Sequence, residues 1–374
     1  MSKLHLPAAC LAALLLTAVA GCGSGSGSAS DSKWAKVDSA ANSMSDLVAE
    51  AKKEGTLTVF TSTDQEEVAD WSKGFTDKYG IKVKVFRQSS SEIGTTFKTQ
   101  VTTHKVQADV FSTGNLDDVQ SFVDDGALAK YTPATAGKFP SDDVVAGYAY
   151  PLYQATAVVG WNTETVPADV QKELEADPYE GLLDPTLKGK VIVIDPAAGG
   201  SGMAIYANLI ENYGDTYGWD YLKKLAAQDP SVQTSIMAMS QQITAGTYSA
   251  TIFATESQWG ELAASGAPLK FAGLPTSSGS QFYQSVVTDA PHPAAARLYQ
   301  EYMMTMKAQD AVSSATGGIS VMNGWKDDRD FIKKLSWYTP PTTVWTGWQT
   351  DPDFTGDALD TFVQKWDDTF GQSR

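Results

Sequence analysis

A glycine-rich turn is the part of this sequence best suited to holding a charged ligand. Residues 191–194 are all β-branched and apolar, which predicts a short strand buried on both faces. Residues 199–202 follow, including Ser201 and Gly202, and Met203 can begin a helix. The free N–H groups of a first helical turn and the positive end of its dipole favour an anion, and glycine allows a close approach. An ordinary strand-to-helix turn remains the alternative.

Several kinds of chemistry are excluded or disfavoured. The turn lacks the spacing of the two common nucleotide-binding loops. No cysteine follows Cys22, which excludes thiolate metal sites and cysteine catalysis from the rest of the chain. The net charge is −16 and no Lys/Arg cluster occurs, so we expect no nucleic-acid partner. His104 and His292 lie outside any catalytic motif, so we expect no enzyme, no cofactor and no resident metal. A surface hydrolase with paired carboxylates is the remote alternative.

The beginning of the chain is typical of a targeting segment followed by a tether. Residues 1–21 combine a basic start at Lys3, a short apolar stretch and small residues before Cys22, as in a lipoprotein signal peptide. Cys22 would then carry a lipid that anchors the protein to the outer side of the cell membrane. Residues 22–33 are mostly Gly, Ser and Ala, which predicts a flexible tether. A plain secretory signal ending near Ala20 is the alternative.

Strands and helices alternate after residue 54, which predicts an α/β fold with a mainly parallel sheet covered by helices. The predicted strands lie at 57–60, 81–86 and 109–111, and a polar turn follows each. In such sheets, ligands bind beyond the carboxyl ends of the strands. The candidate ligand-binding residues of these turns are Ser62, Thr63 and Asp64, then Ser89 and Ser90, and then Ser112, Thr113 and Gly114. Each Ser or Thr could instead cap a helix.

The chain is long enough for two lobes. Residues 148–161 form an apolar, aromatic segment that can cross from one lobe to the other. We predict a first lobe at 34–150, a second lobe at 151–275, and a return to the first lobe at 276–374, which ends in helices.

Aromatic residues near the expected crossing are further site candidates. Tyr153, Trp161 and Tyr283 lie close to the expected hinge and cleft, where a ring can stack on a ligand. The Trp-rich residues 337–348 are expected to pack a terminal segment against a lobe, with contact to a sugar or a cation as the alternative. His292 is expected to begin a helix and not to bind ligand.

Six segments of the sequence resemble those of a known protein family. They read GTLTVFTSTDQEE, FTDKYGIKVKVFRQSSSEI, QADVFSTGN, LLDPTLKGKVIVIDP, ITAGTYSATI and APHPAAARLYQEYMM. Together they resemble the solute-binding proteins of bacterial ABC importers over residues 54–325, in the branch that includes ferric-ion, aminoethylphosphonate and sugar-phosphate binders. The resemblance implies a type II periplasmic-binding-protein fold, with two α/β lobes joined by a strand hinge that close on a small-molecule solute. It also implies a membrane permease as partner, and we expect a monomer.

The same resemblance argues against iron. The family's iron histidine corresponds to Asp64, its glutamate to Gly114, and its tyrosine pair to Thr255 and Glu256. A ferric site needs several hard anionic oxygens or an imidazole, and two carboxylates do not suffice.

The family's anion-holding turn is retained at Ser201, Gly202 and Met203. We therefore expect an anionic or zwitterionic solute such as a phosphonate, a phosphate ester or a carboxylate, with Asp64 or Glu256 pairing with an ammonium group. For Asp64 the alternative is a helix cap, and for Glu256 a solvated loop charge. Ferric ion, or a polyamine or other cation, remains the alternative ligand.

Overall fold

The computed structural model describes residues 43–141, 144–145, 147–198 and 201–372. The predicted signal peptide, the tether, Cys22, Gly199 and Gly200 lie outside the described residues. Within them, no helix is both long and apolar enough to cross a membrane.

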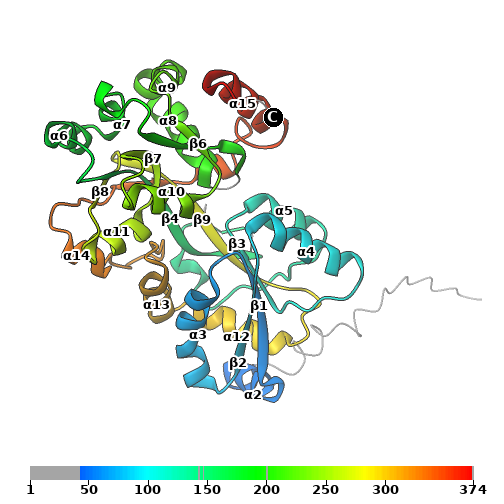
Figure 1. The fold of residues 1–374 in the computed structure, drawn as a ribbon. Helices are drawn as coiled ribbons and strands as arrows, with labels where there is room; N and C mark the ends of the chain where they lie inside the picture. Colours follow the sequence, from blue (N-terminus) through cyan, green and yellow to red (C-terminus); the bar gives the residue numbers. More distant parts are fainter. Residues whose placement is uncertain (1–42, 142–143, 146, 199–200, 373–374) are drawn as a thin grey trace, which may run out of the picture.

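The sheet is built from two halves with the same strand order (Figure 1). In the first half, the order is β2 (Lys82–Arg87), β1 (Thr56–Thr61), β3 (Val110–Thr113), β9 (Thr276–Val286) and β4 (Ala149–Asn162). In the second, it is β6 (Ser231–Gln233), β5 (Val191–Ile194), β7 (Ala250–Thr255), β4 and β8 (Leu269–Ala272). Each half has three parallel strands followed by an antiparallel pair.

Two long strands join the lobes. The 14-residue β4 pairs with β9 over its first part and with β7 and β8 over its second part. The register of the β4–β9 pair shifts between Pro151 and Tyr153, and that of the β4–β7 pair shifts between Val158 and Gly160. Such irregularities bend a strand, and β4 thus has one in its first-lobe part and one in its second-lobe part. The predicted α/β fold with two lobes and a strand hinge is confirmed.

Helices cover both faces of the first lobe. One face carries α2 (Met44–Glu54), α3 (Gln65–Tyr79), α12 (Pro293–Met303) and α13 (Met306–Thr316), and the other carries α4 (Ser90–Thr102) and α5 (Leu116–Asp124). Val59 packs on the first face and its neighbour Phe60 on the second, because successive side chains of a strand point to opposite faces. Burial on both faces explains the continuous apolar runs of these strands.

The second lobe has one large hydrophobic core around β5, whose four residues are at most 1% exposed. Its helices are α6 (Ala168–Ala176), α7 (Pro178–Gly181), α8 (Ser201–Tyr217), α9 (Trp219–Ala226), α10 (Ile236–Thr244), α11 (Glu256–Ala264), α14 (Asp330–Lys334) and α15 (Gly356–Phe370). Short 3-10 turns occur in both lobes. The first lobe has η1 (Ala136–Lys138), and the second has η3 (Pro185–Leu187), η4 (Pro196–Ala198) and η5 (Gly347–Gln349).

The C-terminal segment packs against the second lobe. Its strand β10 (Thr343–Trp345) pairs in parallel with residues 276–278 of β9. Tyr338 and Trp348 belong to the second-lobe core and Trp345 packs against it, so these rings pack a terminal segment, as expected, whereas Trp337 is exposed. By contrast, α12 and α13 contribute to the first-lobe core.

Candidate ligand-binding site

In the described part of the chain, six helices follow the carboxyl ends of parallel strands, and four of them follow the two strands of each lobe that lie nearest the junction of the lobes. In the first lobe, α3 follows β1 and α5 follows β3; in the second, α8 follows β5 and α11 follows β7. The first turn of each helix has N–H groups without intrahelical partners and carries the positive end of the helix dipole. The turns between strand and helix are therefore the places where each lobe can present donors to a ligand.

In the first lobe, the turns after β1 and β3 lie side by side. The Ser62 N–H donates to the Ser112 carbonyl at 3.2 Å. The Oγ atoms of both residues are buried and have no hydrogen-bond partner among the described residues. An unpartnered buried hydroxyl costs about 1–3 kcal/mol, and a group that supplied a hydrogen bond to either oxygen would recover that free energy.

Thr63 and Tyr153 meet next to these serines. Their hydroxyl oxygens are 3.1 Å apart, and both side chains are buried. Burial raises the pKa of Tyr153, so in the free protein its hydroxyl stays protonated and can donate or accept a hydrogen bond. The Tyr153 ring stacks on Phe282, with centroids 4.4 Å apart and an angle of 10° between the planes.

Gly114 lies next to the Phe282 ring of this aromatic pair. A Cβ atom at Gly114 would come within 3.0 Å of the Phe282 ring, which is closer than side chains normally approach. A side chain at this position would require the Phe282 ring to move by a few tenths of an ångström, which favours glycine.

The hinge and the second lobe contribute further hydroxyl groups. A small cavity of about 10 Å³ lies between β4, β7, β9 and the start of α8, and Thr156, Thr255 and Ser280 are among the residues that line it. The Thr156 Oγ1 atom is buried without a partner among the described residues.

The start of α8 packs tightly on the end of β5. A Cβ at Gly202 would lie 3.0 Å from the Asp195 carbonyl oxygen, so glycine allows the close approach. Met203 points into the second-lobe core, with 2% of its surface exposed, and Ser201 is the first residue of the helix.

Glu256 is bound by groups of the protein itself. It is 1% exposed, and its carboxylate oxygens accept hydrogen bonds from Arg329 Nη1 and Nη2 at 2.8 and 3.3 Å. The Tyr338 hydroxyl donates to the same carboxylate at 2.5 Å. Arg329 also pairs with Asp327 at 2.8 Å. Glu256 begins α11 and is not a solvated loop charge, and Arg329 already neutralises it.

Carboxylates near the turn after β1 form a second, acidic part of the site. Asp64 is 64% exposed, lies 3.3 Å from Arg87 Nη2, and stands at the N-cap of α3 without a side-chain capping bond. Burial, with a further contribution from the Asp64 charge, raises the pKa of Glu67 to about 7. Glu261 on α11 of the second lobe adds repulsion to Glu67. Glu67 was not among the residues predicted from the sequence, although its place three residues after Asp64, in the first turn of a helix, was a usable signal.

Other candidates lie apart from these turns. The Ser89 Oγ donates to Glu92 in a capping box, and Ser90 begins α4. The Tyr283 side chain is buried in the core under α4 and α5, and Trp161 in the second-lobe core. His292 stands at the N-cap of α12, as expected of a residue that begins a helix, with its Nδ1 2.9 Å from Asp109 Oδ2.

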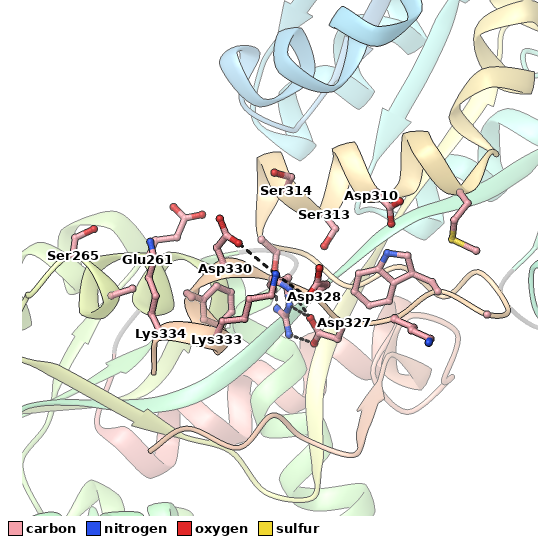
Figure 2. Close-up of a pocket in the computed structure, with 18 residues that line it drawn as sticks. Glu261, Ser265, Asp310, Ser313, Ser314, Asp327, Asp328, Asp330, Lys333 and Lys334 are labelled. Carbon is pink, nitrogen blue, oxygen red and sulfur yellow. Dashed lines mark hydrogen bonds and ion pairs between the residues drawn. The ribbon is translucent and has the colours of Figure 1, made fainter. Parts of the chain in front are cut away.

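A larger cavity of about 940 Å³ is lined by α13 of the first lobe and by α11 and α14 of the second (Figure 2). None of the predicted site residues lines it. Its charged groups largely pair with one another, as Lys333 does with Asp328 at 2.7 Å. Across the described ranges, no group of three or more His, Cys, Asp or Glu side chains could hold a metal ion.

Two lobes of the same strand order, joined by two long strands and presenting polar turns beside the junction, define a type II periplasmic-binding-protein architecture. The model of the bacterial extracellular solute-binding protein family matches residues 57–315. The chain belongs to this family, whose members are solute-binding components of the ABC-transporter type.

Solved structures of similar fold include two periplasmic binding proteins. Iron-bound HitA from Pseudomonas aeruginosa is 19% identical, with a TM-score of 0.64 over 84% of this chain and 99% of that one. AfuA from Actinobacillus pleuropneumoniae, with fructose-6-phosphate bound, is 17% identical, with a TM-score of 0.65 over 86% of this chain and 100% of that one. At these identities, the likeness establishes the fold alone.

One curated protein gives a partial sequence match. An uncharacterized protein of Haemophilus influenzae is 28% identical over 181 residues, which is 47% of this chain and 51% of that protein. The matched region thus spans about half the length of this relative.

Proposed function

We propose that this protein captures a small anionic or zwitterionic solute between its lobes and delivers it to an ABC permease. The observation that carries the proposal is the set of buried hydroxyl oxygens without partners at Ser62, Ser112 and Thr156. These groups lie in the strand-end turns of the first lobe and in the hinge strand. Together with the helix starts, they offer neutral donors to the oxygens of a phosphonate, a phosphate ester or a carboxylate.

Asp64 and Glu67 suit the opposite end of a zwitterion. Both lie close enough to Tyr153 to raise the pKa of its hydroxyl by their charge, although burial is the main cause of that shift. An ammonium group placed here would relieve the repulsion between the two carboxylates. Glu256 has no part in this arrangement, because Arg329 already supplies its cation.

Closure of the lobes is the proposed mechanism of capture. A solute that bonds the Ser62 and Ser112 turns of the first lobe and the Thr255 turn of the second gains contacts only when the lobes are close together. It therefore favours the closed arrangement by the free energy of those extra contacts. The solute is bound and released without reaction, so the protein is a carrier and not an enzyme, and the permease recognises the closed form.

The position of the protein at the membrane follows from the N-terminal sequence. We propose that Cys22 is lipidated and that the protein acts as a monomer on the outer side of the membrane, tethered near its permease. The family supports an extracytoplasmic location.

A cationic solute is the second candidate. The clustering of Asp64, Glu67 and Glu261 favours a polyamine, because Glu67 is repelled by both of the other carboxylates. Ferric ion has less support, since Asp64 is the only carried-over iron position that keeps an exposed carboxylate.

Substitution at the start of α8 tests the proposal. Ser201→Trp places a bulky side chain where we expect the anion, and should abolish binding of 2-aminoethylphosphonate in calorimetry. The control is Ser45→Trp on the exposed surface of α2, which should leave binding intact. Equal affinities of the Ser201 variant and the parent for this probe would show that the start of α8 does not contribute to the binding site.

A further inference from the structure

The C-terminal segment reaches from the second lobe to a candidate ligand turn of the first. Strand β10 lies on the same edge of β9 that pairs with β3 further along. The Trp348 Nε1 donates to the Gly279 carbonyl at 2.7 Å, which fixes η5 beside the hinge. This segment lies beyond residue 315, where the match to the family model ends.

The Gln349 side chain forms hydrogen bonds with a turn of the first lobe and with the hinge strand β9. Its Nε2 donates to the Gly114 carbonyl at 2.8 Å, and its Oε1 accepts from the Gln281 N–H at 2.9 Å. The side chain is 5% exposed. Both halves of the amide are thus used, one on the turn after β3 and one on the hinge strand β9. Because Gln349 is carried by the second-lobe core, a rotation of the lobes must lengthen or break one of these bonds.

A chain of contacts also links Gln349 to the turn after β1, which holds Thr63. Gly114 lies against Phe282, which stacks on Tyr153, whose hydroxyl lies 3.1 Å from that of Thr63. The Gln281 side chain in turn donates to the Tyr153 carbonyl at 3.0 Å. Gln349 is therefore linked to both strand-end turns of the first lobe.

We propose that Gln349 is a positioning residue that holds the Gly114 turn in its ligand-binding conformation and couples that turn to the relative orientation of the lobes. Its effect on ligand affinity rests on the proposed function, but its effect on the turn does not.

Two variants test the proposal in the full mature chain. Gln349→Glu keeps an acceptor for the Gln281 N–H but sets a carboxylate oxygen against the Gly114 carbonyl. Gln349→Met keeps most of the side-chain volume and removes both hydrogen bonds. Gln364→Ala is the matched control, because Gln364 lies on α15 and bonds only Asp368 on the same exposed helix face.

The first measurement is amide hydrogen exchange without ligand. Both Gln349 variants should exchange faster than the parent at residues 112–118 of the first lobe, and Gln364→Ala should not. A merely structural role would instead speed exchange in the second lobe, which carries Gln349, and leave residues 112–118 unchanged. That result would overturn the proposal.

The second measurement is calorimetric titration with 2-aminoethylphosphonate. Loss of one hydrogen bond to the turn should raise the Kd of Gln349→Met about two- to tenfold. An unchanged Kd would also overturn the proposal. If the parent itself does not bind this probe, the proposed function fails on that ligand, while the exchange measurement still decides the role of Gln349.

Discussion

Replacement of Ser112 by alanine should separate ligand binding from folding stability. The Ser112 Oγ is buried and has no partner among the described residues, so the free protein gains nothing from it. Burying such a hydroxyl costs about 1–3 kcal/mol, and Ser112→Ala removes that cost. We therefore expect the free energy of unfolding of the ligand-free variant to stay within about 0.5 kcal/mol of the parent or to rise.

Binding should respond in the opposite direction. A hydrogen bond from the Ser112 hydroxyl to a charged phosphonate or carboxylate contributes about 1.5–3 kcal/mol. Its loss should raise the Kd about 10- to 150-fold. The measurements are urea unfolding without ligand and calorimetric titration with 2-aminoethylphosphonate.

Ser72 provides the matched control. It is also a buried serine of the first lobe, 2% exposed, but its Oγ lies 2.7 Å from the Tyr299 hydroxyl. Ser72→Ala should therefore lower the free energy of unfolding by about 1–3 kcal/mol and leave the Kd unchanged. Equal destabilisation by Ser112→Ala and Ser72→Ala would show that the Ser112 hydroxyl does have a partner in the free protein. A Kd of Ser112→Ala equal to that of the parent would show that this hydroxyl does not bind the ligand.

Two further predictions concern the charged groups. Arg329→Met should lower the free energy of unfolding by about 3–5 kcal/mol in urea, because it leaves the buried Glu256 carboxylate without its cation. Glu256→Gln should lower it less, because Arg329 keeps its ion pair with Asp327. The double variant should recover much of this loss, and fully additive losses would speak against a coupled pair. Glu67 has a folded-state pKa of about 7 against 4.5 in the unfolded chain, so its ionisation destabilises the protein as pH rises from about 4.5 to 7. Glu67→Gln should therefore lose less thermal stability than the parent between pH 5 and pH 8, and parallel pH profiles would contradict this cause.

The sequence was informative where local patterns determine structure. The β-branched run 191–194 predicted a buried strand, and polar turns after apolar strands predicted ligand positions at the edge of a parallel sheet. Ser62 and Ser112 meet because β1 and β3 are neighbours in that sheet. The apolar run at 148–161 predicted one crossing strand, and the resemblance implied a strand hinge, but the second crossing strand, β9, was not identified.

Long-range side-chain pairing was not predictable in the same way. Glu256 and Arg329 are 73 positions apart in the chain. No local sequence pattern shows that the buried Arg329 guanidinium forms an ion pair with the Glu256 carboxylate. Gln349 and Gly114 are 235 positions apart, and the contact depends on how the C-terminal segment packs on the second lobe. Tyr283 was placed near the cleft by its position in the chain, but the alternation of β9 turns its ring toward α4 and α5.

The most direct test of the proposed function is the melting temperature of a chain that begins at residue 33, measured against a panel of solutes. The panel contains phosphonates, phosphates, sugar phosphates, carboxylates, polyamines and ferric ion. A ligand at 100 times its Kd stabilises the folded state by about 2.7 kcal/mol, which should raise the melting temperature by about 5 °C. The account predicts such a shift with an anionic or zwitterionic solute, and predicts that Ser112→Ala reduces it. A shift only with polyamines or ferric ion would contradict the account and make Asp64, Glu67 and Glu261 the centre of the site.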